Sequence, residues 1–171
     1  MFRTTALLVA ATLALTACAP RDSAPKLGPD GQPLPVAYKI SRNDAAEIPV
    51  RLQGQINTLR AGQGLGPVAL NPQLTAAAQI HSTDMSRQNR AWHFGSDGSS
   101  PLDRIRRAGY TGPLVGQNIS ETYESEVQTL QAWMNTRDTR DVIMSPAATQ
   151  IGFAWQQEQN GKLWWTLVVG G

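Results

Sequence analysis

Cysteine is almost absent from this chain of 171 residues, because Cys18 is the only one. One cysteine cannot form a disulfide within the chain, so the stability of the folded part must come from its apolar core. Beyond position 18 the chain also has no cysteine nucleophile, and it has no Gly-x-Ser-x-Gly motif to supply a serine nucleophile. These absences argue against nucleophilic hydrolysis.

Runs of like charge are absent as well. The chain has 15 Lys+Arg against 13 Asp+Glu, and neither sign gathers into a block. Proteins that bind nucleic acid normally carry clustered basic residues, so this sequence does not predict a nucleic-acid partner.

The amino-terminal apolar run, residues 6–15, is too short to span a bilayer as a permanent helix. The run leads into Leu15-Thr16-Ala17-Cys18, which resembles a bacterial lipobox. The resemblance implies a signal peptide over residues 1–17 and lipidation of Cys18, which would attach the protein to a membrane. Ala19, in place of an aspartate, favours the outer membrane of a bacterial cell envelope, facing the periplasm. An ordinary secretory signal with an incidental cysteine is the alternative.

Residues 18–43 are rich in proline and glycine, with five prolines between positions 20 and 35. Such a segment cannot bury enough apolar surface to order itself, so we predict a tether. Its last part, residues 36–40, has an alternating pattern that is compatible with a short edge strand. We expect a single, monomeric domain over residues 44–171.

Four helices are predicted in this domain. The first covers residues 45–60, and the second starts at Pro72, after the N-cap Asn71, and runs to about Asn89. A short third helix follows Ser100 and ends at Gly109, and the fourth covers residues 125–135. The apolar faces predicted for the first, second and fourth helices are Ile48, Leu52, Ile56 and Leu59; Leu74, Ala77, Ala78, His81 and Met85; and Val127, Leu130, Trp133 and Met134.

His81 is one of only two histidines and lies on the apolar face of the second predicted helix. We predict that it is buried and that its ring bonds a backbone carbonyl. A role as a ligand is the alternative.

The carboxyl-terminal residues predict a β-hairpin. Asn160-Gly161 is typical of a two-residue type I′ turn, and this turn would pair Gln157 with Trp164 and Phe153 with Val168. Both faces of such a hairpin are largely apolar, so we expect helices above and below it in a layered sandwich.

The densest polar stretch lies between Trp92 and Ser120. It contains His93, a glycine- and serine-rich turn that includes Asp97, and the glycine-flanked segment Gly116-Gln117-Asn118. Loops held by a rigid scaffold often carry binding groups, so this stretch is a candidate site. A surface loop with ordinary turn chemistry is the alternative.

Several segments between residues 48 and 170 resemble, in their order, the CAP/SCP domain of cysteine-rich secretory proteins, venom antigens and plant pathogenesis-related proteins. The match is to the cysteine-free bacterial branch. The matching segments are Ile56–Arg60, Leu70–Leu74 with Ala77–Ala78, His81–Met85, His93–Gly98, Arg107–Tyr110, Gly116–Ile119 and Ala132–Met134. The resemblance implies an α/β fold, a three-layer α-β-α sandwich with a central antiparallel sheet.

The resemblance also implies a cavity, which in this family often presents two histidines and two acidic residues that can hold a divalent cation. His93 matches the first histidine. Gln117 takes the place of a glutamate, and Thr139 takes the place of the second histidine. Glu121 and Asp138 are close to these positions in sequence and are candidates to complete the set.

We identify His93, Gln117, Thr139, Glu121 and Asp97 as the candidate cavity residues. Gln117 keeps an acceptor oxygen but has no charge, and a threonine is a poor substitute for an imidazole ligand. We therefore expect no metal or other cofactor, although a divalent metal is the alternative.

Two functions follow from this residue set. The first is a lipid-anchored envelope module that is not an enzyme and binds a lipid, a peptide or an envelope polymer. The second is a divalent-metal-dependent hydrolase in the periplasm or on the cell surface. The depleted ligand set favours the first.

Overall fold

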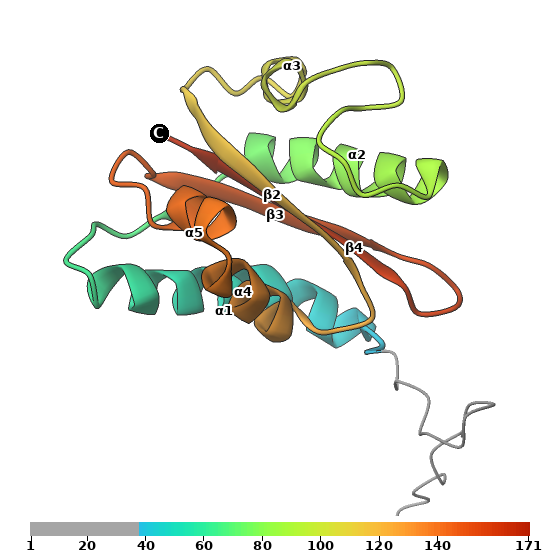
Figure 1. Ribbon diagram of the computed structural model, residues 1–171, viewed down its shortest axis with the longest axis horizontal. Coiled ribbons are helices and arrows are strands. Elements are labelled where there is room, and N and C mark those ends of the chain that lie inside the picture. The colour runs from blue at the N-terminus through green and yellow to red at the C-terminus, as the bar shows by residue number, and fades with distance from the viewer. Residues whose placement is uncertain (1–37) are drawn as a thin grey trace, which may run out of the picture. The chain divides into compact units, whose positions relative to one another are not determined.

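The computed structural model describes residues 38–171, where five helices enclose one four-stranded sheet. In chain order the elements are α1 (Arg42–Ala61), β1 (Ala69–Leu70), α2 (Pro72–Gln88), α3 (Pro101–Arg107), β2 (Leu114–Thr122), α4 (Glu126–Asn135), α5 (Arg137–Ile143), β3 (Gln150–Gln157) and β4 (Leu163–Gly170). Helices α2 and α3 cover one face of the sheet, and α1, α4 and α5 cover the other (Figure 1). The predicted three-layer sandwich is confirmed.

Helix starts follow the capping chemistry of the sequence. Asn71 accepts a hydrogen bond from the Leu74 amide at the start of α2, and proline occupies the first turn. Ser41, Ser100 and Ser125 each form a reciprocal capping box at the starts of α1, α3 and α4. Such caps satisfy amide groups that have no partner within the helix.

The sheet has the strand order β1-β3-β4-β2. The three long strands, β2, β3 and β4, are antiparallel to their neighbours, as predicted. The two-residue β1 pairs in parallel with the start of β3, so the complete sheet is mixed.

The predicted hairpin exists, but its predicted register is wrong by one residue. Gln157 pairs with Leu163 and Phe153 pairs with Leu167. A type I′ turn needs positive φ at both central residues, whereas here only Gly161, at 93°, has it. The Gly161 amide donates to the Glu158 carbonyl and the Glu158 amide to the Lys162 carbonyl, which describes a type I turn followed by a glycine bulge.

This register decides which side chains share a face. Phe153 and Trp165 stack with their ring centroids 5.3 Å apart on the face covered by α1, α4 and α5. Ala154 and Val168 lie on the opposite face, against α2 and α3. The predicted pairs Gln157–Trp164 and Phe153–Val168 would have put Ala154 on the same face as Trp165. Because strand side chains alternate, the one-residue shift puts the two on opposite faces.

Gly152 allows α2 to lie directly against the sheet. A Cβ atom at this position would meet the backbone of Leu74 and Thr75 at 2.0 and 2.2 Å. Such distances are far inside van der Waals contact, so any side chain here would push α2 away from β3.

Two predicted apolar faces need correction. In α1 the position that completes the buried stripe is Arg60, which is 0% exposed, while Leu59 is 39% exposed. In α4 the buried face includes Glu126 instead of Val127, which is 42% exposed. Arg60 extends into the core because its guanidinium finds carbonyl acceptors, at Gly66, Ile143, Ser145 and Ala148.

The folded unit begins before Asp44. Tyr38 and Ile40 pack against the larger apolar cluster, and the Tyr38 amide donates to the Tyr123 carbonyl at 2.9 Å. Residues 38–40 form no strand, contrary to the edge strand considered from the sequence. The compact unit Pro35–Gly171 contains the whole sheet and both apolar clusters, so we expect this segment to fold on its own.

The predicted signal peptide, Cys18 and most of the proposed tether lie outside the described residues. Within residues 38–171, no helix combines the length and the apolar character that crossing a bilayer requires.

Candidate functional site

The loop after α2 carries His93 and is shaped by its own polar groups. Asn89 ends α2 in the left-handed conformation, with φ at 48°. Asp84 then accepts hydrogen bonds from the amide and the hydroxyl of Ser96, at 2.7 and 2.6 Å. Burial acts to raise the pKa of Asp84, but these bonds and one from Gln88 outweigh it and lower the pKa.

The structure brings His93 and Gln117 together, as expected from the resemblance. The Nδ1 atom of His93 lies 3.1 Å from Oε1 of Gln117. Because an amide oxygen can only accept, Nδ1 is the donor in this contact. His93 is exposed and Gln117 is buried.

A third residue, Arg104 of α3, completes this cluster and was not predicted from the sequence. Its Nη2 atom donates to the His93 carbonyl at 2.7 Å and lies 3.4 Å from Oε1 of Gln117, while Nη1 donates to the Ser99 carbonyl at 2.7 Å. Arg104 is 4% exposed, and burial lowers the pKa of its guanidinium. Its signal in the sequence is weak, because Arg106 and Arg107 follow in the same helix and are not buried.

These residues do not fit a divalent cation. The best acceptor, Oε1 of Gln117, already faces one imidazole N–H and a buried guanidinium. A cation beside it would experience the repulsion of Arg104 without a carboxylate to offset it. No group of three or more His, Cys, Asp or Glu side chains suited to a metal occurs in the part of the chain that the structure describes.

The remaining predicted cavity residues do not contact His93. Thr139 donates its hydroxyl proton to the Trp133 carbonyl at 2.7 Å, and its own carbonyl accepts from Asn118. Asn118 follows Gln117 on β2, so the two side chains point to opposite faces of the sheet. Thr139 is therefore tied to the face away from Gln117.

None of the acidic candidates is hydrogen-bonded to His93 within residues 38–171. Glu121 accepts from Nζ of Lys162 at 3.0 Å, and Asp138 is exposed on α5. Asp97 accepts from the Ser99 amide and pairs with Arg107. The hydrogen bonds from Ser99, followed by that from Arg107, hold the pKa of Asp97 far below its usual range.

The serine hydroxyls near His93 also form hydrogen bonds with other residues. Ser96 donates to Asp84, and Ser100 donates to Asp103 in the capping box of α3. Neither hydroxyl is bonded to His93, so the described residues contain no Ser–His pair here. A polar pocket of about 230 Å³ adjoins the loop and is lined by Asp84, Ser96, Asp97, Ser99, Arg104 and Arg107, with Ile80, Arg87 and Gly95.

His81 has the structural role predicted for it. It is 0% exposed, and its Nε2 atom lies 2.9 Å from the Trp92 carbonyl. Burial, followed by the nearby Arg104 charge, lowers the pKa of His81 to about 4, so the ring is neutral at pH 7. Its Nδ1 atom is buried and has no hydrogen-bond partner among residues 38–171.

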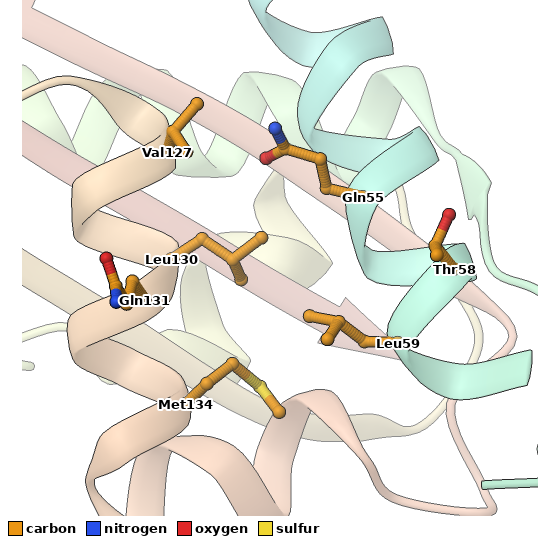
Figure 2. A pocket seen from close by; sticks show the side chains of 7 residues that line it. All are labelled: Gln55, Thr58, Leu59, Val127, Leu130, Gln131 and Met134. Atoms are coloured by element: carbon orange, nitrogen blue, oxygen red, sulfur yellow. The ribbon is translucent and has the colours of Figure 1, made fainter. Parts of the chain in front are cut away.

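A second candidate site lies on the opposite face of the molecule, between α1 and α4 (Figure 2). This groove, which we call the α1/α4 groove, is open to solvent and has a volume of about 410 Å³. Its walls carry Gln55, Thr58 and Leu59 from α1 and Val127, Leu130, Gln131 and Met134 from α4. None of these side chains is charged.

The sequence does not reveal the α1/α4 groove, because the apolar periodicity of the two helices predicts Leu59 and Val127 to lie in the core. Both side chains instead rim the groove and remain partly exposed, while Leu130 is 4% exposed below them. The sequence does contain an indication of the groove, because α1 and α4 each have more apolar residues than their buried faces require. The sequence could not show that the surplus positions face each other across two helices.

Comparison with known proteins agrees with this architecture. Residues 53–169 match the family described as CAP, cysteine-rich secretory protein family. The uncharacterized protein YkwD of Bacillus subtilis is 29% identical over 114 residues, which are 67% of this chain and 44% of that protein. The chain thus spans less than half the length of this curated relative.

Two solved structures share the fold. An extracellular, SCP-domain-containing protein from Bacillus anthracis superposes with a TM-score of 0.64 at 22% identity, covering 78% of this chain and 45% of that one. An outer surface protein from Borrelia burgdorferi gives a TM-score of 0.63 at 16% identity, covering 79% of this chain and 98% of that one. These homologues are extracellular or surface proteins. The matched span covers most of the described residues and both helical layers, and the chain belongs to the cysteine-rich secretory protein (CAP) family.

Proposed function

We propose that this protein is a binding module of the bacterial cell envelope that holds a single-chain lipid in the α1/α4 groove. The observation that carries the proposal is the groove itself, an apolar space of about 410 Å³ without a charged lining residue. Its size falls within the range of roughly 300–1,000 Å³ that is common for small-ligand sites.

The lining chemistry favours a hydrocarbon chain over a peptide. A peptide would bring backbone N–H and C=O groups that need partners when they leave water. On the walls, only Gln55, Thr58 and Gln131 offer polar atoms, and the Thr58 hydroxyl already donates to the Gly54 carbonyl. A hydrocarbon chain needs no such partners and gains about 25 cal/mol for each Å² of apolar surface that it buries.

Catalysis is not part of the proposal. Among the described residues, no nucleophilic side chain is hydrogen-bonded to the imidazole of the His93–Gln117–Arg104 cluster. Hydrolysis assisted by a divalent metal would need a ligand set that these residues do not supply. No observation in the described part of the chain favours the hydrolase hypothesis.

The envelope location rests on two separate lines of support. The Leu15-Thr16-Ala17-Cys18 segment resembles a lipobox, which would attach the domain to a lipid anchor at Cys18. Relatives carry the descriptions extracellular protein and outer surface protein. We propose attachment to the outer membrane, facing the periplasm, with a monomeric domain.

The test is a titration of the segment 35–171 with the neutral fluorescent probe N-phenyl-1-naphthylamine, followed by displacement with dodecanol. Val127→Asp places a charge on the rim of the groove and should weaken dodecanol binding at least ~10-fold, because the chain would then bury a charge. Val50→Asp is the matched control, since Val50 is 61% exposed on α1 and does not line the groove.

Wild-type protein that binds neither probe nor dodecanol would refute the proposal. Equal loss of binding in the two variants would also refute it, because the site would then lie elsewhere.

A further inference from the structure

The polar pocket beside the His93 loop differs in character from the α1/α4 groove. It has a volume of about 230 Å³ and is formed by α2, the loop that follows α2, and α3. We call it the α2/α3 pocket. It is less open to solvent than the α1/α4 groove. One water takes up roughly 30 Å³, so the α2/α3 pocket has room for a small organic molecule.

Five charged side chains line the α2/α3 pocket, and three of them are arginines. Arg107 pairs with Asp97, so these two charges offset each other. Among residues 38–171, Arg87, Arg104 and Asp84 form no ion pair. Hydrogen bonds lower the pKa of Asp84 and of Asp97, so both carboxylates are ionised at pH 7. The lining therefore has a surplus of one positive charge.

Arg104 is the buried cation of the pocket. It is 4% exposed, and its hydrogen bonds go to neutral acceptors on Ser99, His93 and Gln117. Its Nε–H group is buried and has no partner in the described part of the chain. A buried charge that touches no counter-charge is costly, and an anion in the adjoining pocket would offset part of that cost.

Arg87 is the exposed cation of the pocket. It lies in the last turn of α2, two turns after Ile80, so both side chains are on the same face of the helix. A guanidinium can hold a carboxylate through two parallel hydrogen bonds. Ile80 is 56% exposed and lines the same pocket, so it offers an apolar contact next to the charge.

The surplus of one charge distinguishes between anions. A carboxylate carries a single negative charge, which the lining can neutralise. A phosphate monoester carries nearly two charges at pH 7, and the second would be repelled by Asp84 and Asp97. The lining therefore favours a carboxylate over a phosphate.

We propose that the α2/α3 pocket binds the carboxylate of a small organic acid between Arg87 and Arg104, with a short apolar group of the acid against Ile80. Such a carboxylate has two sources, a free short-chain acid and the carboxyl terminus of a peptide. The proposal goes beyond the proposed function, because this second site does not depend on a lipid in the α1/α4 groove.

The test is an NMR titration of the ¹⁵N-labelled segment 35–171 at pH 7, in which arginine Nε–H signals report on the pocket directly. We expect isobutyrate to shift the signals of Arg87, Arg104 and Gly95 with a Kd on the order of 1 mM. The neutral isobutyramide and the doubly charged methyl phosphate should bind at least ~10-fold more weakly. N-acetylalanine represents a peptide carboxyl terminus. Tighter binding of N-acetylalanine than of isobutyrate supports the peptide source, and the reverse order supports the free acid.

Two variants test the charge argument in opposite directions. Arg87→Gln removes the exposed cation and should weaken isobutyrate binding at least ~10-fold. Arg42→Gln is the matched control, because it makes the same change at an exposed position of α1 and should leave binding intact. Asp97→Asn removes a negative charge from the lining and should strengthen the binding of methyl phosphate at least ~10-fold.

Three results would overturn the proposal. The first is a wild-type segment in which isobutyrate shifts none of the pocket signals, or in which isobutyramide binds equally well. The second is an Arg87→Gln variant that binds isobutyrate as tightly as the wild type does. The third is a wild-type segment that binds methyl phosphate more tightly than isobutyrate, because the pocket would then not select a carboxylate.

Discussion

At the scale of single residues, the fold depends on a charge buried without a carboxylate partner. Arg60 is 0% exposed and donates to the carbonyls of Gly66, Ile143, Ser145 and Ala148, which joins α1 to the segment between α5 and β3. We predict that Arg60→Met destabilises the domain by about 3 kcal/mol or more, because several buried carbonyls lose their donors. Urea denaturation measures the loss in the free energy of unfolding. Leu59→Ala, at the neighbouring exposed position, is the control and should lower that free energy far less. Similar costs for the two variants would contradict the role assigned to Arg60.

His81 makes stability depend on pH. Its pKa is about 4 in the folded chain and 6.5 in the unfolded chain. Between these values the unfolded chain binds more protons, so the free energy of unfolding falls as the pH drops from about 6.5 to about 4. The loss should be on the order of 3 kcal/mol.

Denaturation at several pH values checks this prediction. In His81→Gln the slope over the same pH range should be much smaller, whatever the absolute stability of the variant. An unchanged slope would show that other groups cause the dependence.

At the scale of elements, the starts of α2, α3 and α4 follow from the sequence because caps are local chemistry. The four predicted helices do not include α5, whose N-cap Thr136 makes no side-chain cap hydrogen bond, and the start of α1 lies three residues before the predicted one. The start of α2 follows from Asn71 and Pro72, and its end from Asn89. The hairpin register was not readable in the same way. Asn160-Gly161 fits two turn types, and the choice depends on which side chains the flanking strands must bury.

The turn itself is testable through Gly161. Its φ of 93° is unfavourable for any other residue, so Gly161→Ala should destabilise the domain by about 1 kcal/mol. Gln159→Ala, in the same exposed turn, should be nearly neutral. Thermal melts of the two variants make the comparison, and a neutral Gly161→Ala would mean that the turn has another geometry.

At the scale of the whole molecule, the fold could be predicted but the site only in part. His93 and Gln117 meet as expected, whereas Thr139 is tied to the other face of the sheet. The sequence placed these residues near each other along the chain but did not show on which face of β2 each would lie. Arg104 and the α1/α4 groove could not be predicted, because each depends on how separate helices pack.

Attachment to the membrane is also a property of the whole chain, and it remains a prediction at Cys18. Cys18→Ser should leave the protein unprocessed or release it from the membrane fraction, because the lipidated thiol would be missing. Fractionation of cells followed by intact-mass analysis checks this. Unchanged membrane association, with no acyl mass on the wild-type protein, would contradict the anchor.

The central claim is that a lipid chain occupies the space between α1 and α4. The most direct measurement is photo-crosslinking of the segment 35–171 with dodecanol that carries a diazirine near its methyl end, followed by peptide mapping. We predict crosslinks in α1 at residues 55–59 and in α4 at residues 127–134. Crosslinks in the loop around His93, or none that unlabelled dodecanol competes away, would contradict the account.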